Sequence, residues 1–121
     1  MIENIENPIA MALVNWLLPS SGGRISGPPT APVYAANCAF PLGGEQETVP
    51  GWPATAEKFS VFIQRVDDRA HGAWFCKIDF MAPDLVAAYL SPGAEMLVME
   101  GPKVVGRATI EEVLPGRSDD L

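Results

Sequence analysis

Histidine and cysteine, the side chains that most often bind metals or act as nucleophiles, are scarce in this sequence. The 121 residues include one histidine, His71, and two cysteines, Cys38 and Cys76. A structural zinc site takes about four ligands, and neither cysteine has a further Cys or His at metal-ligand spacing. We therefore expect no metal site and no cofactor. Because free cysteine is usually buried, we expect two buried thiols, with a disulfide between them as the alternative.

A catalytic constellation is missing as well. His71 with Cys38 or Cys76 would supply a base and a nucleophile, but no third group stands at a spacing that would orient the base. Glu111 and Glu112 are adjacent, and neighbouring residues of a strand point to opposite faces. We therefore expect a protein without catalytic residues that is not an enzyme.

Long apolar runs and basic clusters are absent too. The apolar stretch at residues 9–18 is too short to span a bilayer, and the acidic start lacks the positive segment of a signal peptide. The eight Lys and Arg are scattered, and the formal net charge is −7. Because an acidic surface repels phosphates, nucleic-acid binding is disfavoured. We expect a cytoplasmic protein that binds neither membranes nor nucleic acids.

Proline and glycine are plentiful, with 12 and 11 residues, and they separate short runs rich in β-branched and aromatic residues. This spacing predicts an all-β barrel or sandwich. The length suits a single domain, 1–121, with a core at about 8–115 and a frayed tail at 116–121. One helical turn is expected at 84–90, capped by Asp84. Strands are expected at about 10–18, 33–40, 58–66, 73–82, 94–100 and 103–114.

The strand at 73–82 is apolar on both of its faces. One face carries Trp74, Cys76, Ile78 and Phe80, and the other carries Phe75 and Met81 beside Lys77 and Asp79. Strands with two apolar faces are usually covered on both, whereas a barrel buries only its inside. Either the loops at 20–32 and 42–55 cover the outer face, or a second subunit does. We expect a homodimer, because large exposed apolar patches usually mark interfaces.

Residues 99–110, MEGPKVVGRATI, have the glycine spacing of a phosphate-binding loop. Such a loop needs a lysine for the phosphates and a Ser or Thr for magnesium. Arg107 and Ala108 stand at those positions, and alanine cannot bind a metal. The segment is better interpreted as a tight turn at Gly101 and Pro102 that leads into a final strand at 103–114.

The order of these segments resembles the C-terminal β-barrel domain, domain three, of the elongation factor Tu family. In that family a first strand runs into an EGGR-type loop, and a REGG-type turn leads into a closing strand. The matching segments here are Gly22-Gly23-Arg24, residues 99–103 and residues 104–110. The resemblance covers about residues 8–115 and implies a six-stranded antiparallel Greek-key barrel, here as a stand-alone protein.

Two departures from the family limit what the resemblance implies. The family's second strand carries arginine and glutamine that face its GTPase domain and aminoacyl-tRNA, whereas residues 31–37 have neither. The first residue of the REGG-type turn is Met99 and not a base. Carriage of tRNA is therefore not implied.

The expected binding residues are Gly22, Gly23, Arg24, Trp52, Lys103 and Arg107. Arg24 would either reach a carboxylate of a partner or fix its own loop by pairing with an internal acid or with carbonyls. Trp52 would be a binding hot spot or would cap an open end of the barrel. Lys103 and Arg107 flank the terminal turn and strand.

These features favour a non-catalytic module that binds another protein, as an adaptor, regulator or inhibitor. One alternative is a small-ligand-binding barrel, or an enzyme, with an aromatic pocket lined by Trp52, Trp74 and Tyr34. An antitoxin or immunity protein is a further alternative.

Overall fold

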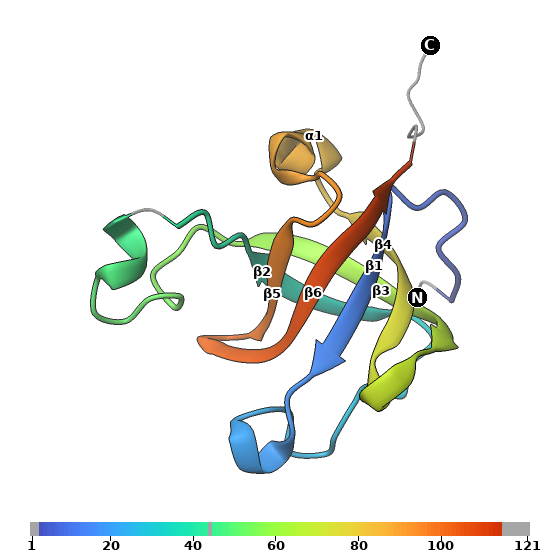
Figure 1. Cartoon of the computed structure of the whole chain (residues 1–121), viewed down its shortest axis with the longest axis horizontal. Coiled ribbons are helices and arrows are strands. Elements are labelled where there is room, and N and C mark those ends of the chain that lie inside the picture. The colour runs from blue at the N-terminus through green and yellow to red at the C-terminus, as the bar shows by residue number, and fades with distance from the viewer. Residues whose placement is uncertain (1–2, 44, 115–121) are drawn as a thin grey trace.

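The computed structural model describes residues 3–43 and 45–114, in which six antiparallel strands close into a barrel (Figure 1). The all-β prediction is therefore confirmed. One short α-helix, α1 (Pro83–Val86), is followed by a 3-10 turn, η4 (Ala87–Tyr89). The other 3-10 turns are η1 (Pro19–Ser21), η2 (Glu45–Thr48) and η3 (Ala70–Gly72). The strands are β1 (Ala10–Trp16), β2 (Tyr34–Ala39), β3 (Phe59–Asp68), β4 (Trp74–Phe80), β5 (Glu95–Glu100) and β6 (Lys103–Val113).

The strand order around the barrel is β1-β4-β3-β2-β5-β6, and β6 pairs with β1 to close the sheet. Strands β2, β3 and β4 pair consecutively, and β1 lies beside β4, which is the Greek-key arrangement. Two long connections make this order possible. Residues 17–33 join β1 to β2, and residues 81–94, with α1, join β4 to β5.

The barrel interior is filled by every second residue of the strands, as the pleat requires. Both cysteines belong to this core and are free thiols, as expected. Figure 1 shows α1 at one end of the barrel. Tyr89, in the η4 turn that follows α1, stacks on Phe40 and packs against Phe59. At the other end, Trp16 makes edge contacts with Tyr34 and Trp74. Fully buried core residues include Val14, Cys38, Val61, Ile63, Cys76, Ile78, Met96, Val98 and Ile110.

Two expectations about turns have different outcomes. The turn at Gly101 and Pro102 joins β5 to β6 as expected, and Gly101 has the positive φ, 59°, that favours glycine. The expected cap of the helical turn was wrong. Ala82 is the N-cap, because Pro83 takes the first helical position and places Asp84 inside the first turn. The expected frayed tail, 116–121, lies outside the described residues.

The chain's own segments cover part of the outer face of the barrel. A second apolar cluster, Ala39, Leu97 and Met99, lies outside the barrel wall and is covered by Trp52 and Ala56 of the loop between β2 and β3. Elsewhere, Ile5 is 4% exposed although it precedes β1. Its N–H donates to Gln64 on β3 at 2.7 Å, and its carbonyl accepts from Lys77 on β4 at 3.0 Å. Both the long loop and the N-terminal segment therefore act as covers.

If the loop contributes a second core, Leu97→Ala should cost about 2–5 kcal/mol of unfolding free energy, as buried Leu→Ala changes do. Urea unfolding followed by circular dichroism measures this loss. The matched control is Leu18→Ala, because Leu18 is 66% exposed and such surface changes stay within about 0.5 kcal/mol. A loss at Leu97 no larger than at Leu18 would show that the loop does not bury this face in solution.

Candidate functional site

Arg24 follows two glycines in the loop after β1, and the backbone at both positions requires glycine. Gly22 has φ 93°, in the left-handed region. A Cβ on Gly23 would lie 2.0 Å from the carbonyl oxygen of Leu17. These two positions therefore require glycine for backbone reasons, and they serve to place the following arginine.

Arg24 binds the end of β5 from this loop. Its Nε donates to Oε2 of Glu100 at 2.7 Å, and its Nη1 donates to the carbonyl of Gly27 at 2.6 Å. The hydroxyl of Tyr34 donates to the same oxygen of Glu100. The guanidinium also lies 5.3 Å from the centre of the Tyr34 ring, a distance at which a cation is attracted to the ring. The two segments that carry the family resemblance thus meet in one ion pair.

The protonation of this cluster follows from its contacts. Desolvation acts to raise the pKa of Glu100, but the hydrogen bonds from Tyr34 and Arg24 outweigh it and leave that pKa below its ordinary value. The bond to Glu100 raises the pKa of Arg24. Burial, followed by donation to Glu100, raises the pKa of Tyr34. At neutral pH the cluster therefore holds a carboxylate, a guanidinium and a neutral phenol.

The other expected binding residues lie at two places. Lys103 is exposed beside Glu100, its register partner across the β5–β6 turn. Arg107 is exposed on β6 opposite Leu97, on which the Trp52 loop packs. Gly22, Gly23, Arg24 and Lys103 therefore gather near the β5–β6 turn, while Trp52 and Arg107 border the covered outer cluster. Met99, the residue before the Glu100 carboxylate, is fully buried.

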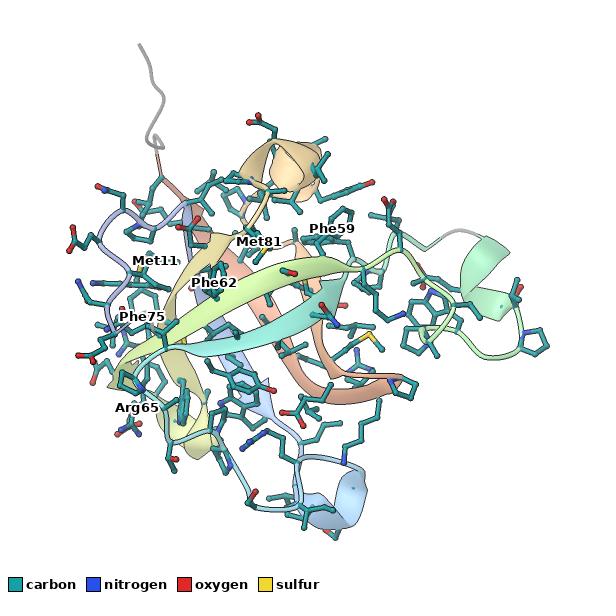
Figure 2. All side chains as sticks on the ribbon, turned by 180° about the vertical axis from the view of Figure 1, so that it is seen from behind. Met11, Phe59, Phe62, Arg65, Phe75 and Met81 are labelled. Atoms are coloured by element: carbon teal, nitrogen blue, oxygen red, sulfur yellow. The ribbon has the colours of Figure 1, made fainter. Side chains whose placement is uncertain are left out.

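Sequence reasoning missed a groove on the outer face of β2 and β3. Small residues of these strands form its floor, and its volume is about 360 Å³. Phe62 and Met81 line it, and Figure 2 labels them near one another. Three residues at the end of β5 and in the following turn line it as well, namely Met99, Glu100 and Gly101. Met81 is 69% exposed. Phe75 and Met81 indicated an apolar outer face, but they could not locate a groove that three strands, β2, β3 and β5, form together with Met81 after β4.

An aromatic pocket lies at the α1 end of the barrel. The sequence indicated an aromatic pocket, but with other residues. Its volume is about 300 Å³. Tyr34 and Trp74, which the sequence placed in one pocket with Trp52, instead contact Trp16 at the opposite end of the barrel. The residues that line the pocket with Trp52 are Phe40, Leu42, Thr55, Ala56, Glu57, Phe59 and Tyr89.

The cysteines and the histidine do not form a reactive pair. Burial raises the pKa of Cys38 and of Cys76 to about 12, and His71 is exposed in the β3–β4 turn. Within residues 3–43 and 45–114, no three His, Cys, Asp or Glu side chains gather as metal ligands. The same residues include no helix long and apolar enough to cross a membrane.

No protein-family model matches this sequence, and no curated protein matches it either.

Glu100→Gln tests the ion-pair cluster. We expect a loss of about 0.5–1 kcal/mol of unfolding free energy at pH 7, because the pair is partly exposed and screened by solvent. The pKa of Glu100 is lowered on folding, so its contribution is present above the ordinary carboxyl range and disappears as pH falls through the lowered value. The difference between wild type and variant should therefore shrink towards pH 3 in urea unfolding curves.

The matched control for this change is Glu111→Gln, since Glu111 is exposed and has no ion pair in the described part of the chain. A difference from wild type that stays constant between pH 7 and pH 3 would contradict the assigned role of Glu100.

The buried thiols should react slowly with a thiol reagent such as Ellman's reagent at pH 8. We expect native protein to react roughly a hundredfold or more slowly than protein unfolded in urea, because only the thiolate reacts. Stopped-flow absorbance measures both rates. Rapid modification of one thiol in the native protein would show that Cys38 or Cys76 is accessible, and would reopen the nucleophile hypothesis.

Proposed function

We propose that this protein is a non-catalytic binding module, and that the groove over β2 and β3 receives an extended apolar segment of a protein partner. The observation that carries the proposal is the groove itself. The N-terminal segment and the Trp52 loop cover other apolar parts of the outer face. Between them the groove remains open, with the exposed side chain of Met81 on its side.

The shape of the groove favours an extended segment. Ala35, Asn37 and Ser60 contribute small side chains to it from two paired strands. Small side chains let another backbone lie close to the sheet, while Phe62 and Met81 offer apolar surface to its side chains. Recognition of extended peptides on sheets commonly combines such a surface with pockets for alternate side chains.

Charge indicates the kind of partner. With a net charge of −7, the protein attracts a basic partner over distance and repels an acidic one. The groove supplies apolar contact, and the acidic net charge speeds the encounter with a basic partner. The proposed partner is therefore a basic protein that presents an extended apolar segment.

A relationship to the C-terminal barrel of the elongation factor Tu family is part of this proposal. It is supported by the closed six-stranded Greek-key barrel and by the ion pair that joins the Gly22–Arg24 loop to the β5–β6 turn. A shared fold does not carry over tRNA binding. We place the protein in the cytoplasm, where two free thiols remain reduced.

Met81→Glu should strongly reduce partner capture while leaving the barrel folded, because this side chain is 69% exposed. A carboxylate buried against an apolar segment weakens binding by tenfold or more, since about 1.4 kcal/mol is a factor of ten. Tagged wild type and variant are compared by quantitative mass spectrometry of proteins captured from the native lysate.

The control variant is Leu18→Glu, which makes the same chemical change at a site 66% exposed and outside the groove. The proposal is supported by a basic protein, recovered in stoichiometric amount, that Met81→Glu loses and Leu18→Glu keeps. Equal recovery with all three proteins would overturn it. Light scattering tests whether a second copy of the chain occupies the groove instead. A wild-type dimer that Met81→Glu converts to monomer would assign the groove to that second copy.

A further inference from the structure

We propose that the aromatic pocket at the α1 end of the barrel binds a weakly hydrated organic cation, namely a methylated ammonium or a guanidinium group. The pocket shares no lining residue with the groove over β2 and β3. The proposal is thus independent of the partner-binding function and goes beyond it.

The size of the pocket fits one head group. Its volume is about 300 Å³, at the lower end of the range of roughly 300–1,000 Å³ typical of ligand sites. The pocket lies between the barrel end and the loop that carries Trp52. It therefore suits a small cation or a single side chain, and it is too small for an extended ligand.

Aromatic residues make up half of the residues that line the pocket. Phe40 and Tyr89 are stacked with centroids 5.0 Å apart, and Phe59 lies 5.9 Å from each of them. These three rings form a wall at the barrel end, and Trp52 lines the same cavity from the loop. All four side chains are only half-buried, so part of each ring remains accessible. Ring faces attract cations within about 6 Å, most strongly at tryptophan.

One charged side chain, a carboxylate, lines the pocket. Glu57 is the one ionisable carboxyl among the lining residues. It is exposed and forms no ion pair in the described part of the chain. The neighbouring ammonium of Lys58 donates instead to the carbonyls of Ala54 at 2.6 Å and Ala56 at 3.2 Å. A carboxylate beside aromatic rings favours a cation over a neutral or anionic ligand of the same shape.

The strength of hydration determines which kind of cation the pocket prefers. A primary ammonium holds its water strongly, whereas a guanidinium is weakly hydrated and stacks on aromatic faces. Methylation likewise replaces hydrated N–H groups by apolar surface, which is why aromatic sites recognise quaternary ammonium groups. The four rings offer apolar faces that favour the weakly hydrated cations, and the polar part of the lining, which is about as large, includes Thr55 and the Glu57 carboxylate.

The first experiment is an NMR titration of the purified full-length protein with choline and with 3,3-dimethyl-1-butanol, its neutral isostere. The three tryptophans give three indole N–H signals. We expect choline to shift the Trp52 signal and to leave those of Trp16 and Trp74, at the opposite end, in place. Binding of choline should be about fivefold or more tighter than binding of the alcohol. No shift at about 50 mM choline, or equal binding of the two probes, would overturn the proposal.

Two variants place the effect at the pocket. Glu57→Gln should weaken choline binding about three- to tenfold, while Glu6→Gln, which removes one exposed charge elsewhere, should leave it unchanged. Because Glu57 is exposed, its substitution does not threaten folding. Equal affinity for choline in both variants would show that the carboxylate plays no part and would overturn the assignment.

A final comparison identifies the source of the cation. A short peptide with a central trimethyllysine is titrated beside choline and beside the same peptide with unmodified lysine. Tighter binding of the methylated peptide than of choline assigns the site to a side chain of a protein. Equal binding of the methylated peptide and choline assigns the site to a free head group. Preference for the unmodified peptide would contradict the proposed role of weak hydration.

Discussion

Strand β1 pairs on both of its edges, with β4 and with β6, and this double pairing closes the sheet into a barrel. A closed barrel has no free strand edges, so the chain needs neither a disulfide nor a long helix to complete its sheet. Closure also fixes which residues face inward. Cys76 and Ile78 enter the core, while Phe75 and Met81 on the same segment are left outside.

A small barrel buries only the apolar residues on the inner face of its sheet. Segments outside the barrel cover part of the apolar outer face. Ile5 is held over β3 and β4 by backbone bonds to Gln64 and Lys77. Trp52 and Ala56 cover Leu97 and its neighbours. Both candidate binding surfaces lie where these covers end. The groove begins at Met99, which the loop covers, and the aromatic pocket lies between the same loop and the barrel end. The loop between β2 and β3 therefore shapes both surfaces.

The charge cluster at the β5–β6 turn has a different role in this arrangement. Arg24, Tyr34 and Glu100 satisfy one another, and the arginine additionally holds the carbonyl of Gly27. Of the two roles expected for Arg24, the internal pairing is the one observed. An arginine held this way fixes the long connection from β1 to β2 against the barrel wall, and it leaves Lys103 as the exposed cation at the turn.

Local pattern determined the strands. The expected segments at 73–82 and 103–114 contain β4 and β6 entirely, whereas β3 continues two residues beyond the expected 58–66. The period of two also indicated that β4 is apolar on both faces, and the usual burial of free cysteine indicated buried thiols. Tertiary structure decided the rest. Glu100 is 76 residues from Arg24, and Phe40, Trp52, Phe59 and Tyr89 come together only because the barrel closes and a loop folds back on it. Such contacts depend on the order of the strands in the barrel and on the path of the loops. Neither can be read from the spacing of residues along the chain.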